Sequence, residues 1–339
     1  MSEEKWTAFF RHAESLGVRV ERNRPMANNT TYGVGGVAAC ALAVTSRHEL
    51  QEVAGLLAAH PQIPVAVVGR GSNLLVADEG FDGVVVLMSY AANEHAIEAV
   101  GDDIVAAGAM PMPILARRSI ALGRAGLEWC VGIPGSVGGA VRMNAGGHGA
   151  EIVDALVSAE IVSMKSGRWA TIAASDMGLH FRGSALSPHH VVISACLNTT
   201  VRTDESVDID EVVTWRRQHQ PGGRNAGSVF VNPAQGEGSA GALIDSCGLR
   251  EFAIGGARVS EKHANFIQAS DGATAADIVA VMSHVQSVVE QQTGIRLRSE
   301  VCMLGFNDEV MQAFADPRHS DGDRIAQAQR VCELMGETQ

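Results

Sequence analysis

The stretch Gly132-Ile-Pro-Gly-Ser-Val-Gly-Gly-Ala-Val-Arg-Met-Asn-Ala-Gly-Gly147 decides the fold, because it holds six glycines in sixteen residues. A chain places glycine at this density where its backbone must turn tightly or come close to a ligand. Ser136 stands where it could cap a helix. A compact helix start is therefore an alternative interpretation of this stretch, and it is compatible with ligand binding.

A second glycine loop lies upstream. Residues 69–74, Gly-Arg-Gly-Ser-Asn-Leu, directly follow a short apolar run that predicts a strand. Successive backbone N–H groups in such a loop form an anion-binding concavity. The loop is not the Rossmann fingerprint, because Leu74 stands in the place of the third glycine. Taken alone it is best interpreted as a tight turn, but two glycine loops beside strands suit an extended dinucleotide.

The composition points to a soluble chain of two or three domains. A chain of 339 residues is long for a single hydrophobic core. Hydrophobic residues make up 46% of it, which is enough to fill several cores. The formal charge of −12 argues against a general nucleic-acid binder. No apolar run could span a bilayer and the charged N-terminus is unlike a signal peptide, so we expect no membrane partner and a cytoplasmic location. Six isolated cysteines predict free thiols and no metal site.

Apolar periodicity predicts helices and strands in alternation. The expected helices are 3–16, 47–59, 112–122, 208–219, 241–247, 274–292 and 324–335. The expected strands include 39–44, 64–68, 84–88, 104–107, 154–164, 167–172, 191–201 and 297–304. The tail after Phe306 is polar, and its sequence suggests no function.

Ten short segments occur in the order of one known family. They are 29–31, 69–77 with 80–83, 126–128, 132–146, 181–184, 220–221, 226–233, 240–245, 259–264 and 298–301. Together they resemble the UDP-N-acetylenolpyruvoylglucosamine reductase (MurB) family over roughly residues 28–306. The short link between Arg182 and the strand expected at residue 191 resembles the shorter class of that family, which lacks an extra substrate loop.

The resemblance implies an α/β (α+β) architecture. It consists of an FAD-binding fold of the PCMH/vanillyl-alcohol-oxidase type in two subdomains, residues 1–88 and 89–205, and a C-terminal α+β substrate domain, residues 206–306. Residues 307–339 form a tail of unassigned role. The implied cofactor is FAD, with NADPH as the hydride donor. The implied reaction reduces a sugar nucleotide, UDP-N-acetylglucosamine enolpyruvate, to UDP-N-acetylmuramate for the cell wall. Separately, we expect a monomer or weak dimer.

Three residues match the family's catalytic positions. Arg182 would pair with the substrate carboxylate, and Ser228 would donate a proton to the carbanionic carbon. Glu300 would polarise the enolate or orient Arg182, and as a neutral donor it would need a raised pKa. In isolation each has a plainer interpretation: a surface ion pair, a turn hydroxyl and a solvated edge charge. The joint occurrence of the three residues in the contexts of this family favours the catalytic interpretation over the plainer one.

The resemblance also implies binding residues. Those for the cofactor are Gly69, Arg70, Gly71, Ser72, Asn73, Leu74, Gly132, Ile133, Pro134, Gly135, Ser136, Gly138, Gly139, Asn144, Ala145 and Gly146. Those for the substrate are Gln220, Asn232 and Lys262, the last for the diphosphate, although a plain surface lysine is an alternative.

The chain departs from the family's pattern at three positions. Phe181 and His148 stand where tyrosine is frequent, and Val231 stands where lysine is frequent, which leaves fine substrate contacts open. Two other functions remain as alternatives. One is an FAD-dependent oxidoreductase of the same fold acting on a different sugar or alcohol, with His148 as a conceivable point of covalent attachment. The other is a catalytically silent sugar-nucleotide-binding protein.

Overall fold

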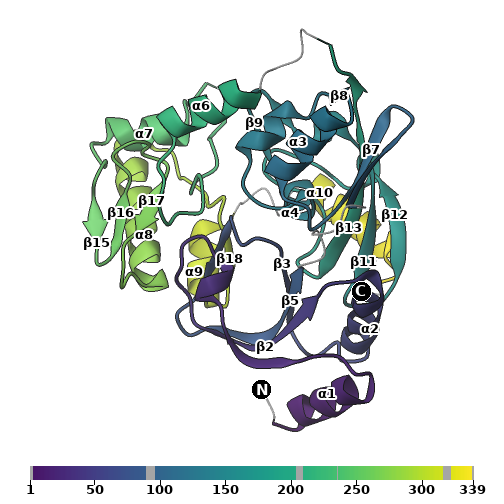
Figure 1. The fold of residues 1–339 in the computed structure, drawn as a ribbon. Helices are drawn as coiled ribbons and strands as arrows, with labels where there is room; N and C mark the ends of the chain where they lie inside the picture. Colours follow the sequence, from purple (N-terminus) through teal and green to yellow (C-terminus); the bar gives the residue numbers. More distant parts are fainter. Residues whose placement is uncertain (1–2, 89–95, 204–208, 235, 316–321, 338–339) are drawn as a thin grey trace.

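The computed structural model describes residues 3–88, 96–203, 209–234, 236–315 and 322–337. A four-stranded sheet with the order β1-β2-β5-β3 forms the first part of the chain (Figure 1). The strands β2, β5 and β3 are parallel, and β1 is antiparallel to β2. The elements are α1 (Glu3–Ser15), β1 (Glu21–Pro25), β2 (Val37–Val44), α2 (Arg47–Ala58), β3 (Val65–Val68), β4 (Leu74–Val76) and β5 (Phe81–Met88).

Local sequence explains this part well. The hydroxyl of Ser46 accepts a hydrogen bond from the backbone N–H of Glu49 and so begins α2. Leu50 of α2 and Phe9 of α1 are buried in one core with the sheet. Val162 and Ile193 of the second sheet are buried in this core too, so the two sheets pack against each other.

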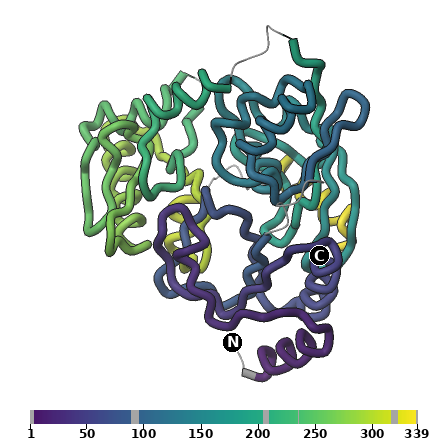
Figure 2. The backbone as a smooth tube through the Cα atoms, in the orientation of Figure 1, coloured from purple at the N-terminus to yellow at the C-terminus, as the bar shows by residue number. Residues whose placement is uncertain are grey.

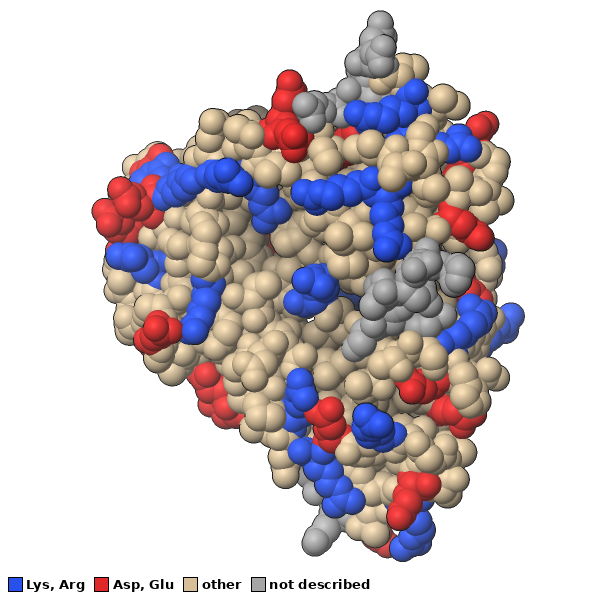
Figure 3. Space-filling view, viewed as in Figure 1, with Lys and Arg blue, Asp and Glu red and all other residues tan. Residues whose placement is uncertain are grey.

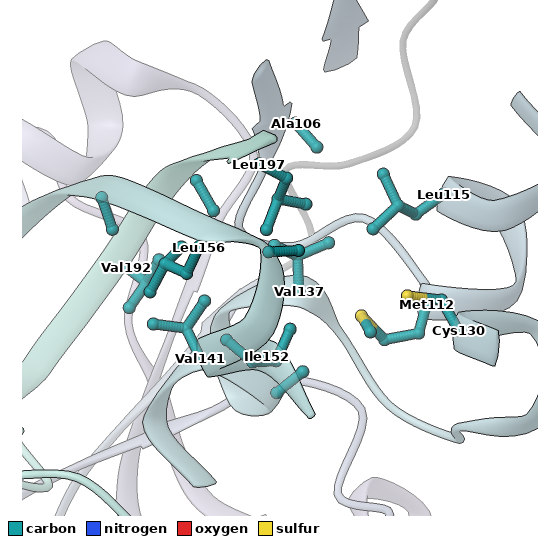
Figure 4. Close-up of a cluster of buried hydrophobic side chains, with 14 of the residues drawn as sticks. Ala106, Met112, Leu115, Cys130, Val137, Val141, Ile152, Leu156, Val192 and Leu197 are labelled. Carbon is teal, nitrogen blue, oxygen red and sulfur yellow. The ribbon is translucent and has the colours of Figure 1, made fainter. Parts of the chain in front are cut away.

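The second sheet has five antiparallel strands in the order β12-β11-β13-β7-β6. Its core contains Val137 and Val141, the apolar face of the short helix α4 within the glycine-rich stretch (Figure 4). The elements are β6 (Ile97–Val100), β7 (Asp103–Ala107), α3 (Met112–Ala121), β8 (Arg124–Ala125), α4 (Val137–Met143), β9 (Gly146–Gly147), β10 (Ala150–Glu151), α5 (Ile152–Ala155), β11 (Leu156–Ser163), β12 (Trp169–Ala173), β13 (His190–Asn198) and β14 (Thr200–Val201).

A third part packs helices against a small three-stranded sheet, β15-β16-β17. Its long helix α8 begins at a capping box formed by Thr274 and Asp277 and ends at Gly294, whose φ of 76° suits glycine. The elements are α6 (Ile209–His219), α7 (Ala240–Ser246), β15 (Ala253–Ile254), β16 (Ala257–Val259), β17 (Ile267–Ala269) and α8 (Ala275–Thr293). The predicted first residue of α6, 208, lies outside the described residues, as do 205 and 206 at the predicted domain boundary.

The chain then returns to the first part. The strand β18 (Cys302–Leu304) runs parallel to β4 and pairs with it. The predicted strand 297–304 is therefore too long: the backbone of 298–300 instead hydrogen-bonds to Val229 and Val231. Two helices follow, α9 (Asp308–Phe314) and α10 (Gly322–Leu334). In Figure 2, α9 lies beside the third part and α10 lies behind the five-stranded sheet. No described helix is long and apolar enough to cross a membrane.

Candidate active site

A cavity of about 320 Å³ opens between the three parts of the fold. Both glycine loops, the start of β13, the end of α6 and segments of the third part line it. The structure brings nearly all the predicted site residues to this cavity, including Arg182, Ser228 and Glu300. Asn144 and Lys262 are the two predicted site residues that do not line it.

The two glycine loops lie directly against each other. A Cβ atom added to Gly69 would come within 2.5 Å of the Ser136 hydroxyl, and one added to Gly135 within 2.7 Å of the Ser72 hydroxyl. Gly135 also has a φ of 113°, which side-chain-bearing residues rarely adopt. The absence of a Cβ atom in each loop lets the two loops approach this closely, and both loops line the same cavity.

The first loop is tied to the end of the third part. The side-chain amide of Asn73 donates to the Glu300 carbonyl at 2.9 Å, and the Cys302 N–H donates to the Asn73 carbonyl at 3.0 Å. The β4–β18 ladder continues directly from these bonds. A loop of the first part and the Glu300 backbone thus form one hydrogen-bonded unit.

Arg182 sits at the tip of a tight turn. Residues 180 and 183 exchange two backbone hydrogen bonds, and Arg182 has a φ of 59°. Such a conformation costs of order 1–3 kcal/mol for a residue other than glycine and is concentrated at functional sites. The guanidinium donates to Glu151 at 3.0 Å and to the Gly146 carbonyl at 3.3 Å. Since each terminal nitrogen carries two N–H groups, each keeps one for a ligand.

Asn144 supports this arrangement from behind the cavity wall. It ends α4 with a φ of 40° and is 1% exposed. Its amide nitrogen donates to the Glu151 carboxylate at 2.9 Å and to the His180 carbonyl at 3.1 Å. Asn144 therefore holds both the carboxylate that pairs with Arg182 and the turn that carries Arg182.

Ser228 is presented on a rigid segment. The residue after it, Val229, accepts a hydrogen bond from the Glu300 N–H at 2.8 Å. The Asn265 side chain brackets Phe230, accepting from its N–H at 2.9 Å and donating to its carbonyl at 2.8 Å. Within the described parts of the chain, the Ser228 hydroxyl makes no hydrogen bond, so it is open to the cavity.

Glu300 lies next to Arg182, with 3.2 Å between its Oε1 and the arginine Nε. Burial raises the pKa of Glu300 to about 7, while Arg182 acts in the opposite direction and Glu151 adds to the rise. The carboxyl group can therefore carry a proton near neutral pH. A protonated carboxyl group is what Glu300 needs in order to act as a hydrogen-bond donor.

The cavity is electropositive although the whole chain is acidic. Four arginines line it, Arg70, Arg142, Arg182 and Arg216, against the single carboxylate of Glu300. The Nε of Arg142 is buried and has no hydrogen-bond partner among the described residues. Basic side chains also stand around the hollowed centre of the face shown in Figure 3. Such a donor set, with two glycine loops on one wall, fits a dinucleotide diphosphate and an anionic substrate.

Comparison with known proteins decides the family. Residues 38–173 match the FAD binding domain family, and residues 218–304 match the C-terminal domain of UDP-N-acetylenolpyruvoylglucosamine reductase. The enzyme of that name from Gloeobacter violaceus is 42% identical over 286 residues, which cover 81% of this chain and 93% of the relative. This chain belongs to the UDP-N-acetylenolpyruvoylglucosamine reductase family.

Other members agree with this assignment. The reductase from Paramagnetospirillum magneticum is 40% identical over 86% of this chain and 94% of its own length. The crystal structure of the Thermus caldophilus reductase aligns with a TM-score of 0.70 and 32% identity, covering 85% of this chain and 99% of that one. The predicted family and the predicted FAD-binding α/β fold are thereby confirmed. As a member of the reductase family, the chain is an FAD-dependent oxidoreductase.

The three departures from the family's pattern have distinct surroundings. Phe181 is 39% exposed, and the Arg182 guanidinium lies 4.7 Å from its ring centroid. His148 packs edge-on against Trp215 of α6, with 4.9 Å between the ring centroids, and does not line the cavity. Val231 is buried, so an aliphatic side chain is accommodated there.

Several residues that line or support the reductase cavity were not among the predicted site residues. Glu151 and Asn265 hold the Arg182 and Ser228 segments, and Arg142, Arg216 and His190 line the wall. Glu151 had a local signal, since it forms a capping box with Asp154 at the start of α5. That box also explains why β11 begins at Leu156 and not at the predicted residue 154.

Proposed function

We propose that this cavity reduces the enolpyruvyl ether of UDP-N-acetylglucosamine enolpyruvate to UDP-N-acetylmuramate, with Arg182, Ser228 and Glu300 dividing the chemistry. The observation that carries this proposal is their convergence on one cavity with both glycine loops. Family membership supplies the reaction class and the two redox partners, FAD and NADPH.

Bound FAD would supply hydride transfer from NADPH to the methylene carbon of the substrate. Negative charge then builds at the carbon that bears the carboxylate. Arg182 can bind that carboxylate through its two unused terminal N–H groups while Glu151 and Gly146 hold its other donors. Because these partners fix the guanidinium beforehand, little reorganisation is needed when the charge develops.

Ser228 is the proposed proton donor to the carbanionic carbon. Ser228 lines the cavity, its hydroxyl has no hydrogen-bond partner among the described residues, and Asn265 and Glu300 hold the backbone that follows it. Serine is a weak acid, but an enolate is a strongly basic acceptor. General acid catalysis of this kind contributes about 10²–10⁴ in rate.

Glu300 is proposed to act beside Arg182 on the same charge. With a pKa raised to about 7, its protonated form can donate a hydrogen bond to the developing enolate. Its ionised form pairs with Arg182 at 3.2 Å and would orient the guanidinium. The two forms correspond to the two roles predicted for it, and the dependence of the rate on pH distinguishes them.

The binding residues are proposed as follows. The loops 69–74 and 132–146 hold FAD, with Asn144 acting through Glu151 and the Arg182 turn. Gln220 and Asn232 line the cavity and are proposed to contact the substrate. The Lys262 ammonium contacts the Arg217 carbonyl in α6, three residues before Gln220. To hold the diphosphate it must leave that carbonyl and reach around the end of α6.

The remaining proposals concern the setting. We place the enzyme in the cytoplasm as a monomer or weak dimer, without a nucleic-acid or membrane partner, on the basis of its charge of −12 and its apolar patterning. The alternative of a different sugar or alcohol oxidase gains no support, because His148 is packed against Trp215 outside the cavity lining. Oxidation of NADPH that depends on the enolpyruvyl sugar nucleotide, with the muramate product identified by mass, tests the proposal.

A further inference from the structure

The C-terminal extension, here the residues after β18 that are described at 305–315 and 322–337, packs into two cores of the molecule. Phe314 of α9 is buried in the core of the third part, whereas Val331 and Met335 are buried in the core of the five-stranded sheet. In Figure 1, α9 accordingly lies beside β18, and α10 lies behind β13. The match to the family's C-terminal domain ends at residue 304, so this extension lies beyond it.

The end of the extension carries a buried carboxylate. The side chain of Glu337 is 2% exposed. It accepts hydrogen bonds from the Ser163 hydroxyl at 2.6 Å, from His190 Nε2 at 2.7 Å and from His189 Nε2 at 3.0 Å. The Ser166 hydroxyl also donates to the Met335 carbonyl at 2.6 Å. Together these bonds hold residues 335–337 against the turn between β11 and β12 and the start of β13.

The protonation state of this cluster follows from its geometry. The Ser187 N–H donates to His190 Nδ1 at 3.0 Å, so the ring proton must be on Nε2, and it points at Glu337. A metal ion could bind Nε2 only after this proton had left. Because the proton is instead donated to Glu337, His189, His190 and Glu337 form a hydrogen-bonded cluster and not a metal site. Burial lowers the pKa of His190 despite the opposing bond to Glu337, in agreement with a neutral ring.

His190 connects the extension to the cavity. It lines the cavity together with the next two residues of β13, Val191 and Val192. Both ring nitrogens are engaged away from the cavity, by Ser187 and Glu337. The His190 side chain is 0% exposed, so it lies behind the wall, and what a carboxylate 147 residues away holds at the cavity is the backbone at the start of β13.

We propose that the C-terminal extension is an integral part of the flavin site, in which Glu337 is a positioning residue that fixes His190 and the start of β13 in the cavity wall. The inference rests on FAD occupying this cavity, as in the proposed function. Loss of the carboxylate leaves His190, His189 and Ser163 without their shared acceptor in a buried place, where an unpaired polar group is costly. The wall then rearranges, and FAD binds less tightly.

The test compares full-length variants at two glutamates of the same extension. Glu337→Ala and the milder Glu337→Gln remove or weaken the acceptor. Glu333→Ala is the matched control, because the Glu333 side chain is 72% exposed and its ion pair with Arg330 is a long one of 4.0 Å. The readout is the dissociation constant for FAD, from the change in flavin fluorescence on binding. We expect a rise of about tenfold for Glu337→Ala, a smaller rise for Glu337→Gln and no change for the control.

An unchanged dissociation constant in the Glu337 variants would overturn the proposal. A merely structural role would reduce the number of FAD sites in the titration and leave the dissociation constant of the remaining sites unchanged, and this outcome would overturn it as well. If Glu337→Ala does not fold, Glu337→Gln decides by the same criterion. Because the readout is FAD binding, a wild-type protein that binds FAD but does not reduce the enolpyruvyl substrate would refute the proposed reaction alone.

Discussion

The side-chain amide of Asn73 donates a hydrogen bond to the backbone carbonyl of Glu300, 2.9 Å away and 227 residues later in the chain. Asn73 belongs to the first glycine loop, and the Glu300 carboxyl group lies beside Arg182. The β4–β18 ladder extends the same connection. The loop proposed to hold FAD and the groups proposed to act on the substrate are therefore parts of one frame, which fixes their separation.

Replacement of Ser228 by alanine tests the proposed proton donor. Flavin reduction by NADPH should stay near normal, because that step needs no proton from Ser228. Reduction of the enolpyruvyl substrate should slow by about 10²–10⁴. Anaerobic stopped-flow absorbance separates the two half-reactions. Ser246→Ala, at an exposed serine of α7, is the control and should change neither. Equal slowing of both half-reactions by Ser228→Ala would rule out the assignment.

Replacement of Arg182 by lysine tests the fixed guanidinium. Lysine keeps the charge but cannot contact Glu151, Gly146 and a ligand carboxylate in one plane. We expect the substrate half-reaction to fall by about 10² or more, with FAD bound as before. Arg330→Lys, at an exposed arginine of α10, serves as the control. A wild-type rate in Arg182→Lys would show that charge alone suffices.

Glu300→Gln tests the role of the carboxyl proton. With a pKa of about 7, the wild-type group loses its proton as the pH rises through neutrality. If the neutral form donates to the enolate, the substrate half-reaction should fall above about pH 7 in the wild type. In the glutamine variant this dependence should disappear, since its amide remains a donor. A wild-type rate that increases through pH 7 would instead favour the ionised form, which orients Arg182.

The same residue affects stability in a direction that can be measured. Because the folded pKa of Glu300 is raised from 4.5 to about 7, the folded state binds its proton more tightly than the unfolded state. Its contribution to the free energy of unfolding is therefore greatest at low pH and is lost as the pH rises through about 7. Urea titrations give the free energy of unfolding of Glu300→Gln minus that of the wild type. This difference should be more positive at pH 8 than at pH 5. A difference independent of pH would contradict the raised pKa.

Gly135→Ala tests the contact between the glycine loops. A Cβ there would approach the Ser72 hydroxyl at 2.7 Å, on a backbone with a φ of 113°. We expect the free energy of unfolding to fall by about 1–3 kcal/mol, with weaker FAD binding. Gly55→Ala in α2 is the matched control. It has no neighbour within 4 Å of the added Cβ and should stabilise the chain by about 0.5–1 kcal/mol. Equal effects of the two changes would contradict this account.

Local sequence predicted what local physics determines. Ser46 marks the start of α2, and the glycine runs mark the two loops, because caps and tight turns depend on a few adjacent residues. The helix α9 also had such a signal, in Asn307 as N-cap with Val310 and Phe314 on one face, but the polar composition of the tail concealed it.

Long-range pairing could not be predicted in this way. The contacts of Arg182 with Glu151 and of His190 with Glu337 join residues 31 and 147 positions apart, and no periodicity encodes them. The predicted strand 297–304 was too long for a related reason: residues 298–300 hydrogen-bond to Val229 and Val231, and only Cys302–Leu304 pair with β4. The candidate site was recognised through its resemblance to a family, and only the structure shows how Asn144 and Glu151 support it.

The most direct test of the central claim uses the wild-type protein without oxygen. The flavin is reduced with NADPH, UDP-N-acetylglucosamine enolpyruvate is added, and the absorbance of the oxidised flavin is followed. We predict rapid reoxidation of the flavin with formation of UDP-N-acetylmuramate. Reduction by NADPH without reoxidation by this substrate would contradict the proposed function.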